Sequence, residues 1–401
     1  MIDMEARTII EALRSGIPSK EVGRYFSEAR PALMNKTVSR LEDACEAGKS
    51  SGMVVIGKYG EGKTHLLSAV NVIASDDNMV VSQLSLGKEG PMDKLYVIYQ
   101  KMINNTYLPG QDNPGFADKL LSLTPENPLS DKILDYCSNS LETNKLYYVF
   151  RSLIYSDDSE DRYRLLMDLQ GDLLPNATLR AIAKKTSTEK VRFNIPFAKS
   201  KHMMDYFFAM SHLFRLLGYS GWAILFDEAE LLGRLSKKAR LLAYDNIYSF
   251  LHPKAKLENT FSLFALSASY EEDVIEGKNE YENAEAFFPE NRQIPSVLDS
   301  LKKGTRLTPL TKEEMLFTFE KLISFHGKAY DWNPQIDAES LLRQAGDAGF
   351  LLRTKIRYAI EILDELYQYG EKGETTIGTL TEEDIVREDD SSEEENPEEG
   401  K

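Results

Sequence analysis

The sequence predicts an α/β fold that is built on a parallel β-sheet. The first observation is that short apolar segments alternate with longer segments whose apolar residues recur at helical spacing. The second is that the short segments are almost continuously apolar, as expected of parallel strands, which are buried on both faces. Four segments fit this description, namely 53–56, 78–86, 222–228 and 261–269.

The composition is ordinary for a globular protein with room for two or three domains. The chain has 401 residues, of which 42% are hydrophobic and 28% are charged. Its first residues, MIDMEARTIIEALRSG, form an amphipathic pattern without the apolar core of a signal peptide, and no window approaches eighteen apolar residues. Cys45 and Cys137 show no pairing pattern, which is typical of a reducing compartment. We therefore expect a cytoplasmic protein without a membrane-spanning segment.

The N-terminal part of the chain predicts two helical stretches and then the first strands. Residues 4–49 are expected to be helical with a break at 16–19, where Ser19 can cap the next helix. The elements expected after them are, in order, a strand at 53–56, a helix at 64–75, a strand at 78–86 and a helix at 94–103.

The remainder of the chain is mostly helical. Residues 116–200 form a helical block between the second and third strands, so we expect a helical insertion into the sheet. The elements expected after it are a helix at 202–219, a strand at 222–228, a helix at 236–252, a strand at 261–269 and helices to about 370. The expected domains are an N-terminal helical segment (1–49), an α/β core (50–309) with the insertion at about 116–200, a C-terminal helical lid (310–375) and an acidic tail (376–401).

A glycine-rich stretch behind the first strand predicts a phosphate-binding loop. The sequence GKYGEGKT matches G-x-x-x-x-G-K-[ST] in full. Its glycines let peptide amides approach phosphate oxygens, and the start of the following helix adds partial positive charge. Lys63 is expected to reach the β- and γ-phosphates, and the Thr64 hydroxyl is expected to bind Mg²⁺. The expected nucleotide-binding residues here are Gly57, Lys58, Tyr59, Gly60, Glu61, Gly62, Lys63, Thr64 and His65, of which the last is expected to pack or cap.

Two acids at the end of the third strand complete the expected ATPase site. Asp227 lies where a Walker B aspartate holds the hydration shell of Mg²⁺. Glu228 can polarise the attacking water as a general base. The sequence contains no N-K-x-D motif for guanine. Together with the loop, these acids predict a P-loop NTPase that uses ATP and Mg²⁺.

Three further positions are candidates, and each has an alternative reading. Ser267 or Ser269, at the end of the fourth strand, can orient the attacking water or simply cap the strand. Arg353 lies at the start of a helix of the lid and can contact the γ-phosphate, or it is an ordinary solvated arginine. Arg357, one helical turn further on, is the alternative candidate for this role. Arg292 can act as an arginine finger for a neighbouring subunit, or it is an ordinary surface arginine.

Charge is distributed unevenly along the chain, whose formal net charge is −16. Residues 382–401 contain eleven acidic and two basic residues, so we expect a disordered tail that solubilises the protein, binds a partner or mimics DNA. Residues 180–201 have the opposite bias, with only Glu189 against seven cations. This basic stretch is a candidate contact for a nucleic-acid backbone, and its alternative is pairing with acids elsewhere. Its cations are Arg180, Lys184, Lys185, Lys190, Arg192, Lys199 and Lys201.

These motifs resemble a known class of ATPases. The P-loop, the Asp-Glu pair, the serine-bearing strand and the arginine-bearing lid resemble an AAA+ ATPase of the origin-recognition type. The segments RTIIEALRSGIPS, RYFSEARPALMNKTVSRLEDA and GKYGEGKTHLL resemble more narrowly the BrxD-type ATP-binding proteins of bacteriophage-exclusion (BREX) defence islands. The resemblance runs from about residue 6 to 375.

The resemblance carries implications for individual residues and partners. It implies that Lys63 and Thr64 bind ATP·Mg²⁺, that Asp227 and Glu228 support hydrolysis, and that the segment containing Ile17 and Pro18 lies near the adenine. It also implies a large superfamily-2 helicase as a partner. The expected function is thus an ATPase, acting as a homo-oligomer, that drives or loads a nucleic-acid-processing complex in phage defence. The alternatives are a nucleotide-dependent switch that acts on partner proteins without touching DNA, and a signalling ATPase that binds an effector or toxin.

Overall fold

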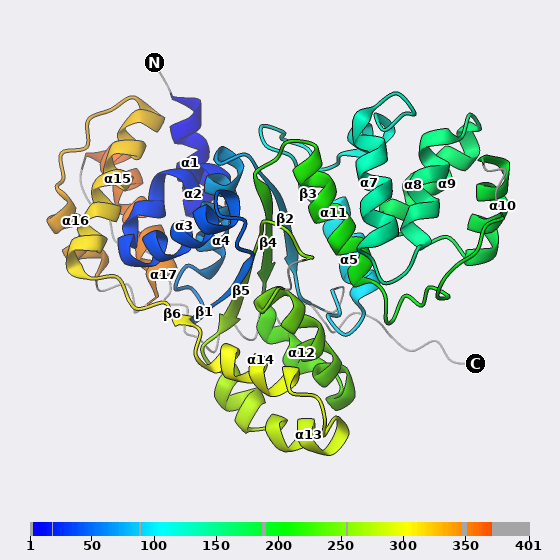
Figure 1. Ribbon diagram of the computed structural model, residues 1–401. Coiled ribbons are helices and arrows are strands. Elements are labelled where there is room, and N and C mark those ends of the chain that lie inside the picture. The colour runs from blue at the N-terminus through cyan, green and yellow to red at the C-terminus, as the bar shows by residue number, and fades with distance from the viewer. Residues whose placement is uncertain are drawn as a thin grey trace, which may run out of the picture. The chain divides into compact units, whose positions relative to one another are not determined.

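A six-stranded sheet organises the fold (Figure 1). The computed structural model describes residues 3–17, 19–87, 90–186, 190–253, 256–346 and 351–370. The strand order is β3-β2-β4-β5-β1-β6. The strands are β1 (Ser51–Gly57), β2 (Met79–Ser85), β3 (Thr106–Tyr107), β4 (Gly221–Asp227), β5 (Thr260–Ser267) and β6 (Thr305–Arg306).

The sheet is mostly parallel, which confirms the predicted α/β fold. β2, β4 and β5 run parallel to one another, and β6 runs parallel to β1. β4 is buried along its whole length, which explains why its sequence is apolar without alternation. β3 departs from the expectation because it pairs antiparallel with β2. β3 and β6 have two residues each, too few to produce a recognisable apolar pattern.

The chain divides into two compact units. The first, called the sheet unit here, comprises Ala32–Ile56 and Val70–Arg306. The second, called the terminal unit, comprises Met1–Pro31, Gly57–Ala69 and Leu307–Lys401. The elements β1 and α4 (Lys63–Asp76) begin in one unit and end in the other.

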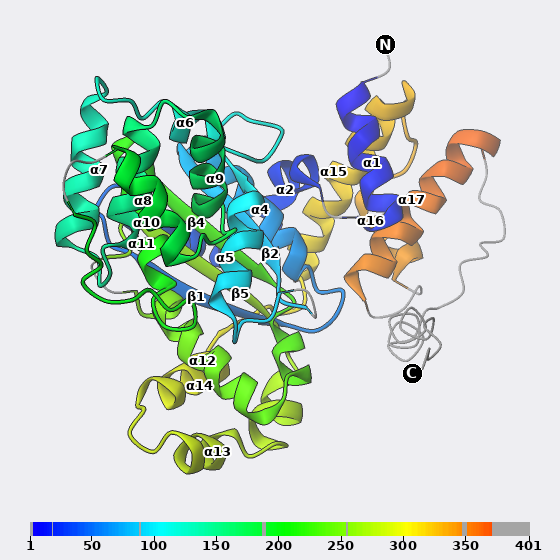
Figure 2. The same ribbon diagram turned by 90° about the vertical axis from the view of Figure 1, so that its right-hand side faces the viewer.

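Helices of the sheet unit gather in separate groups. In both views α7 to α10 form one cluster beside α11, and α12 to α14 form another (Figures 1 and 2). The predicted helical block at 116–200 corresponds to α6 to α10 and ends earlier than expected, at Thr186. The helices are α3 (Pro31–Cys45), α5 (Leu95–Asn104), α6 (Ala117–Leu121), α7 (Pro128–Asn139), α8 (Lys145–Tyr155), α9 (Ser159–Leu169), α10 (Asn176–Thr186), α11 (Met204–Leu216), α12 (Lys237–Leu251), α13 (Glu280–Phe287) and α14 (Gln293–Lys302), with the short helical turns η2 (Ala229–Arg234) and η3 (Glu271–Glu276).

A buried ion pair joins the helices of the insertion. The Lys145 ammonium lies 2.9 Å from Asp168, and the two side chains are 1% and 0% exposed. Asp168 also accepts hydrogen bonds from the Tyr206 hydroxyl (2.5 Å) and the Leu174 amide (2.6 Å). Burial, followed by the charge of Asp168, raises the pKa of Tyr206 well above its ordinary value, so this hydroxyl stays a donor. The pair therefore ties α8, α9 and α11 together through a network of satisfied polar groups.

The terminal unit joins the two ends of the chain in one core. Ala6 and Ile10 of α1 are buried with Phe319, Ile360 and other residues of the C-terminal helices. This association of the first helix with the lid is not visible in the sequence pattern. The helices are α1 (Met4–Ser15), α2 (Lys20–Phe26), η1 (Ser27–Ala29), α15 (Lys312–Tyr330), α16 (Ala338–Ala345) and α17 (Leu352–Tyr369).

The helix cap predicted near the N-terminus is confirmed. The Ser19 hydroxyl accepts from the Val22 amide and caps α2, as predicted. Pro18 and the acidic tail lie outside the described residues. Within the described part of the chain, none of the helices combines the length and apolarity that a membrane crossing requires.

Candidate functional site

The predicted phosphate-binding loop lies where β1 ends and α4 begins. β1 ends at Gly57 and α4 begins at Lys63, so the motif has the expected context of strand, loop and helix. Gly60 and Gly62 have φ values of +73° and +98°. A side chain at either position would strain the backbone, which explains why the loop needs glycine there. Positive φ values at loop positions are a feature of the backbone nests in which peptide amides bind anions.

The Lys63 ammonium is held against the loop. Its Nζ donates to the carbonyl oxygens of Gly57 (2.9 Å) and Lys58 (3.2 Å). The Glu61 carboxylate accepts a hydrogen bond of 2.7 Å from the Lys58 amide and closes the turn. Thr64 follows in the first turn of α4 and is partly exposed. The surrounding packing lowers the pKa of His65 below its ordinary value, because desolvation disfavours the imidazolium. His65 is therefore neutral at pH 7.

Arg30 supports the loop and was not predicted. Its guanidinium Nη2 donates to the Glu61 carbonyl at 2.9 Å, and its Nη1 donates to the Thr308 carbonyl. Gly23 allows α2 to pack closely on α4, because a Cβ at this position would lie 2.7 Å from the Ser68 carbonyl carbon of α4. The N-terminal segment thus packs closely on the loop and its helix. No local motif identifies these contacts, because they join residues that are at least 31 positions apart in the sequence.

Three segments that are distant in the sequence meet beside the loop. The Arg353 guanidinium lies 3.3 Å from the Tyr59 hydroxyl and 3.5 Å from the Ser15 carbonyl. A Cβ on Gly16 would lie 2.3 Å from Arg353 Nε, so the side chain lies directly against the end of α1. Ile17, which follows, is 64% exposed. The structure therefore brings the predicted adenine segment, the loop and the predicted lid arginine together within the terminal unit. Arg357, the alternative, is partly buried in α17.

The acids at the end of β4 are held by a residue that sequence reasoning missed. Asp227 is buried and accepts a 2.9 Å hydrogen bond from the Glu228 amide. Glu228 is exposed and has a φ of +53°, a left-handed conformation that is uncommon for glutamate and concentrated at functional sites. The Ser85 hydroxyl donates to its carboxylate. Ser85 is the last residue of β2 and lies directly opposite Asp227 in the register. A polar residue at the end of an apolar strand is the one sequence signal that could have indicated this role.

The end of β5 contains both candidate serines. Ser267 Oγ lies 3.3 Å from Ser269 Oγ, so the two hydroxyls form one polar group and neither is singled out. The Ser267 amide donates to the Glu230 carboxylate at 3.0 Å. Glu230, in η2 just after Asp227, was not predicted. Because β4 and β5 are parallel neighbours, their final residues lie at the same edge of the sheet.

Arg292 and the basic stretch lie elsewhere in the sheet unit. Arg292 is exposed and immediately precedes α14. In the basic stretch, Lys185 pairs with Asp161 at 2.7 Å, and Arg180 lies over the Phe193 ring at 5.2 Å. Lys184, Lys190 and Arg192 are exposed, and Lys199 lies over the Tyr96 ring. Part of the stretch is thus engaged within the fold, and part is free to meet a ligand.

Comparison with known proteins identifies the family. The sequence matches the family described as BREX system ATP-binding protein BrxC/D over residues 2–120 and 150–377. No curated protein and no solved structure matches the chain. The match covers most of the chain, including both the predicted phosphate-binding loop and the acids at the end of β4. The α/β fold with its glycine-rich motif is consistent with an ATP-binding family. The chain belongs to the BrxC/D family of BREX system ATP-binding proteins.

Proposed function

We propose that the chain is a Mg²⁺-dependent ATPase that acts in BREX phage defence. The observation that carries the proposal is the complete loop motif at the β1–α4 junction, with left-handed Gly60 and Gly62. In this proposal Lys63 contacts the β- and γ-phosphates and Thr64 binds Mg²⁺, because these groups occupy the motif positions that do so. The family membership supports ATP as the ligand.

Hydrolysis is assigned to the acids at the end of β4. Asp227 would hold the hydration shell of Mg²⁺, and Glu228 would act as the general base for the attacking water. The Ser85 hydrogen bond fixes the direction of the Glu228 carboxylate. One of the serines at 267 and 269 would orient the water. Ile17 and Pro18 are proposed to lie near the adenine.

Arg353 is proposed to contact the γ-phosphate. Its contacts with Tyr59 and the end of α1 place a cation beside the loop in the terminal unit. An arginine at this point can link the state of the nucleotide to the lid, since it belongs to α17.

Purified protein is expected to release phosphate from ATP only when Mg²⁺ is present. The metal neutralises charge that develops on the transferred phosphoryl group, so chelation with EDTA should abolish turnover. Phosphate release is measured with ATP and with GTP, before and after Mg²⁺ is restored. Equal turnover in EDTA would contradict the proposed chemistry, and equal use of GTP would contradict the choice of nucleotide.

Arg292 is proposed to complete the site of a neighbouring copy in a homo-oligomer. Its exposure before α14 leaves it free to do so, and arginine fingers in other NTPases contribute about 10³-fold or more to the rate. Arg292→Ala should lower turnover without weakening ATP binding. A mixture with Lys63→Ala chains should recover part of the activity, because each subunit supplies the group that the other lacks. An inactive mixture in which mixed oligomers are demonstrated would exclude a shared site.

The work driven by ATP is proposed to be the processing of nucleic acid, with a helicase as partner. The support is the exposed set Lys184, Lys190 and Arg192 on an otherwise acidic chain. Replacing these three with glutamine should weaken DNA binding and flatten its salt dependence by about 0.9 log units per lost phosphate contact. Lys185→Gln is the matched control, since its ammonium is already paired with Asp161. Binding is measured by fluorescence anisotropy between 50 and 200 mM salt.

A second candidate is a nucleotide-dependent switch that acts on partner proteins. The pairing of Lys185 and the stacking of Arg180 on Phe193 favour it, because they give part of the basic stretch a structural role. Unchanged DNA affinity in the triple glutamine variant, with ATP turnover intact, would select this candidate.

A further inference from the structure

One edge of β1 is only partly covered by its neighbouring strand. β6 pairs with β1 at Val55 and Ile56, and Gly304, just before β6, lies against Val54. Among the described residues, the stretch from Ser51 to Met53 therefore has no strand on that side. The Gly52 carbonyl instead accepts a 2.7 Å hydrogen bond from Arg40 Nη1. An open strand edge offers backbone N–H and C=O groups to a further strand.

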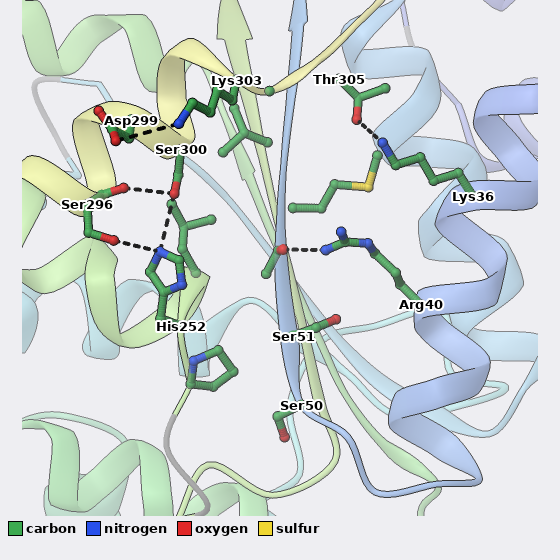
Figure 3. Close-up of a pocket in the computed structure, with 16 residues that line it drawn as sticks. Lys36, Arg40, Ser50, Ser51, His252, Ser296, Asp299, Ser300, Lys303 and Thr305 are labelled. Carbon is green, nitrogen blue, oxygen red and sulfur yellow. Dashed lines mark hydrogen bonds and ion pairs between the residues drawn. The ribbon is translucent and has the colours of Figure 1, made fainter. Parts of the chain in front are cut away.

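A pocket of about 700 Å³ follows this open edge (Figure 3). Five consecutive residues, Ser50 to Val54, contribute to it, so it extends along the strand. Its other lining residues come from α3 and from the region of α12, α14 and the start of β6. All of them belong to the sheet unit, and none belongs to the phosphate-binding loop.

The walls of the pocket lie on opposite faces of β1. The Met53 sulfur lies 3.9 Å from Thr37 Oγ1 of α3. A Cβ on Gly52, by contrast, would lie 2.4 Å from the Leu251 Cα at the end of α12. Consecutive residues of a strand point to opposite faces, so α3 covers one face and α12 the other. A strand added beside β1 would therefore present alternate side chains to two different walls.

The α3 wall is cationic. Lys36 donates to the Thr305 hydroxyl at 2.9 Å and Arg40 to the Gly52 carbonyl, and neither has a carboxylate partner among the described residues. Arg40 is partly buried, which strengthens any charge-assisted hydrogen bond that it makes. This wall suits carboxylate side chains.

The opposite wall is close to neutral and rich in hydrogen-bonding groups. His252 Nε2 lies 3.2 Å from Ser300 Oγ, and desolvation lowers the pKa of His252, so its imidazole is neutral at pH 7. Lys303 is paired with Asp299 at 3.6 Å. Figure 3 shows these residues across β1 from Lys36 and Arg40. This wall suits small hydroxyl-bearing side chains.

We propose that the open edge of β1 is a docking site for an extended peptide of a partner protein, in which acidic residues alternate with serine or threonine. The peptide would add a strand beside Ser51–Met53. Its carboxylates would face Lys36 and Arg40, and its hydroxyls would face the wall formed by α12 and α14. Arg40 would exchange the Gly52 carbonyl for a peptide carboxylate, which leaves that carbonyl free to accept a peptide N–H.

The probe is a fluorescein-labelled octapeptide in which glutamate and threonine alternate, used with the full chain. We expect it to bind, and the Lys36→Gln and Arg40→Gln variants to bind it at least tenfold more weakly. Lys36→Gln removes no contact to the strand backbone, so it keeps the test valid if Arg40→Gln folds poorly. Lys132→Gln, an exposed lysine on α7, is the matched control and should bind like the wild type.

Two further probes separate strand addition from attraction between charges. A peptide of four glutamates followed by four threonines has the same composition and charge, and it should bind at least tenfold more weakly. Methylation of alternate amides on one edge of the alternating peptide should abolish binding. Hydrogen exchange should show protection of the amides in Ser51–Met53 when the alternating peptide is bound.

Each contrary outcome overturns the proposal. Equal affinity for the two peptides would reduce the site to a cationic patch. If millimolar inorganic phosphate displaced the probe from the wild type but not from Lys36→Gln, the pocket would be a site for small anions. Absence of binding would mean that Lys36 and Arg40 only shield the strand edge, a protection common in β-sheets.

Discussion

Replacing Glu228 with glutamine is expected to reduce ATP turnover by about 10²–10⁴-fold while ATP binding is kept. Glutamine has the shape of glutamate and can still accept the hydrogen bond from Ser85, but it cannot take a proton from water. Single-turnover phosphate release measures the chemical step, and calorimetric titration measures the affinity. Turnover at the wild-type rate would remove Glu228 from the role of general base.

The Lys63→Ala variant is the control, because its expected defect is in ATP binding rather than in the chemical step. It should lose ATP binding, because a charge-assisted contact to the phosphates disappears. Ser85→Ala should give an intermediate result, with binding intact and a smaller loss of turnover than Glu228→Gln. If Ser85→Ala turned over ATP normally, the hydrogen bond to Glu228 would have no part in positioning the base.

Replacing Asp168 with alanine is expected to destabilise the sheet unit by about 3–5 kcal/mol. The substitution leaves the Lys145 ammonium buried without its counter-ion, and it deprives the Tyr206 hydroxyl and the Leu174 amide of their acceptor. The loss is measured as a lower urea midpoint followed by tryptophan fluorescence, because Trp222 is buried in β4 of the same unit.

A double variant distinguishes the cost of an unpaired charge from the value of the pair. Lys145→Met with Asp168→Leu removes both charges, and it should recover much of the stability that Asp168→Ala loses. Asp172→Ala, at an exposed acid three residues beyond α9, is the control and should change the midpoint little. A double variant as unstable as the single one would show that the network matters through its hydrogen bonds rather than its charges.

The sequence predicted the sheet well where a strand is long enough to bury both faces. β2, β4 and β5 lie within a few residues of the expected segments, because each contains at least three consecutive apolar residues. β3 and β6 could not be predicted, because a two-residue strand has no periodicity. The π-helical turn at 271–276 has no distinctive pattern either.

The candidate site could be proposed from the sequence only where its residues are contiguous. The predicted phosphate-binding loop is a single stretch of eight residues, so its motif is visible in the sequence. Arg30, Ser85 and Glu230 could not be assigned, because each acts through a hydrogen bond to a residue on another element. Arg353 was a candidate from its position alone, and the structure adds its contact with Tyr59 and the end of α1.

The shared core of α1 and α15 has a consequence for biosynthesis. Ile10 packs in the same core as Phe319, so the apolar face of the first helix leaves the ribosome long before its partner exists. At about 5–20 residues per second, the delay between the two is roughly 15–60 s. During this time the nascent chain presents an unpaired amphipathic helix, which a chaperone or an assembling partner can bind before the terminal unit closes.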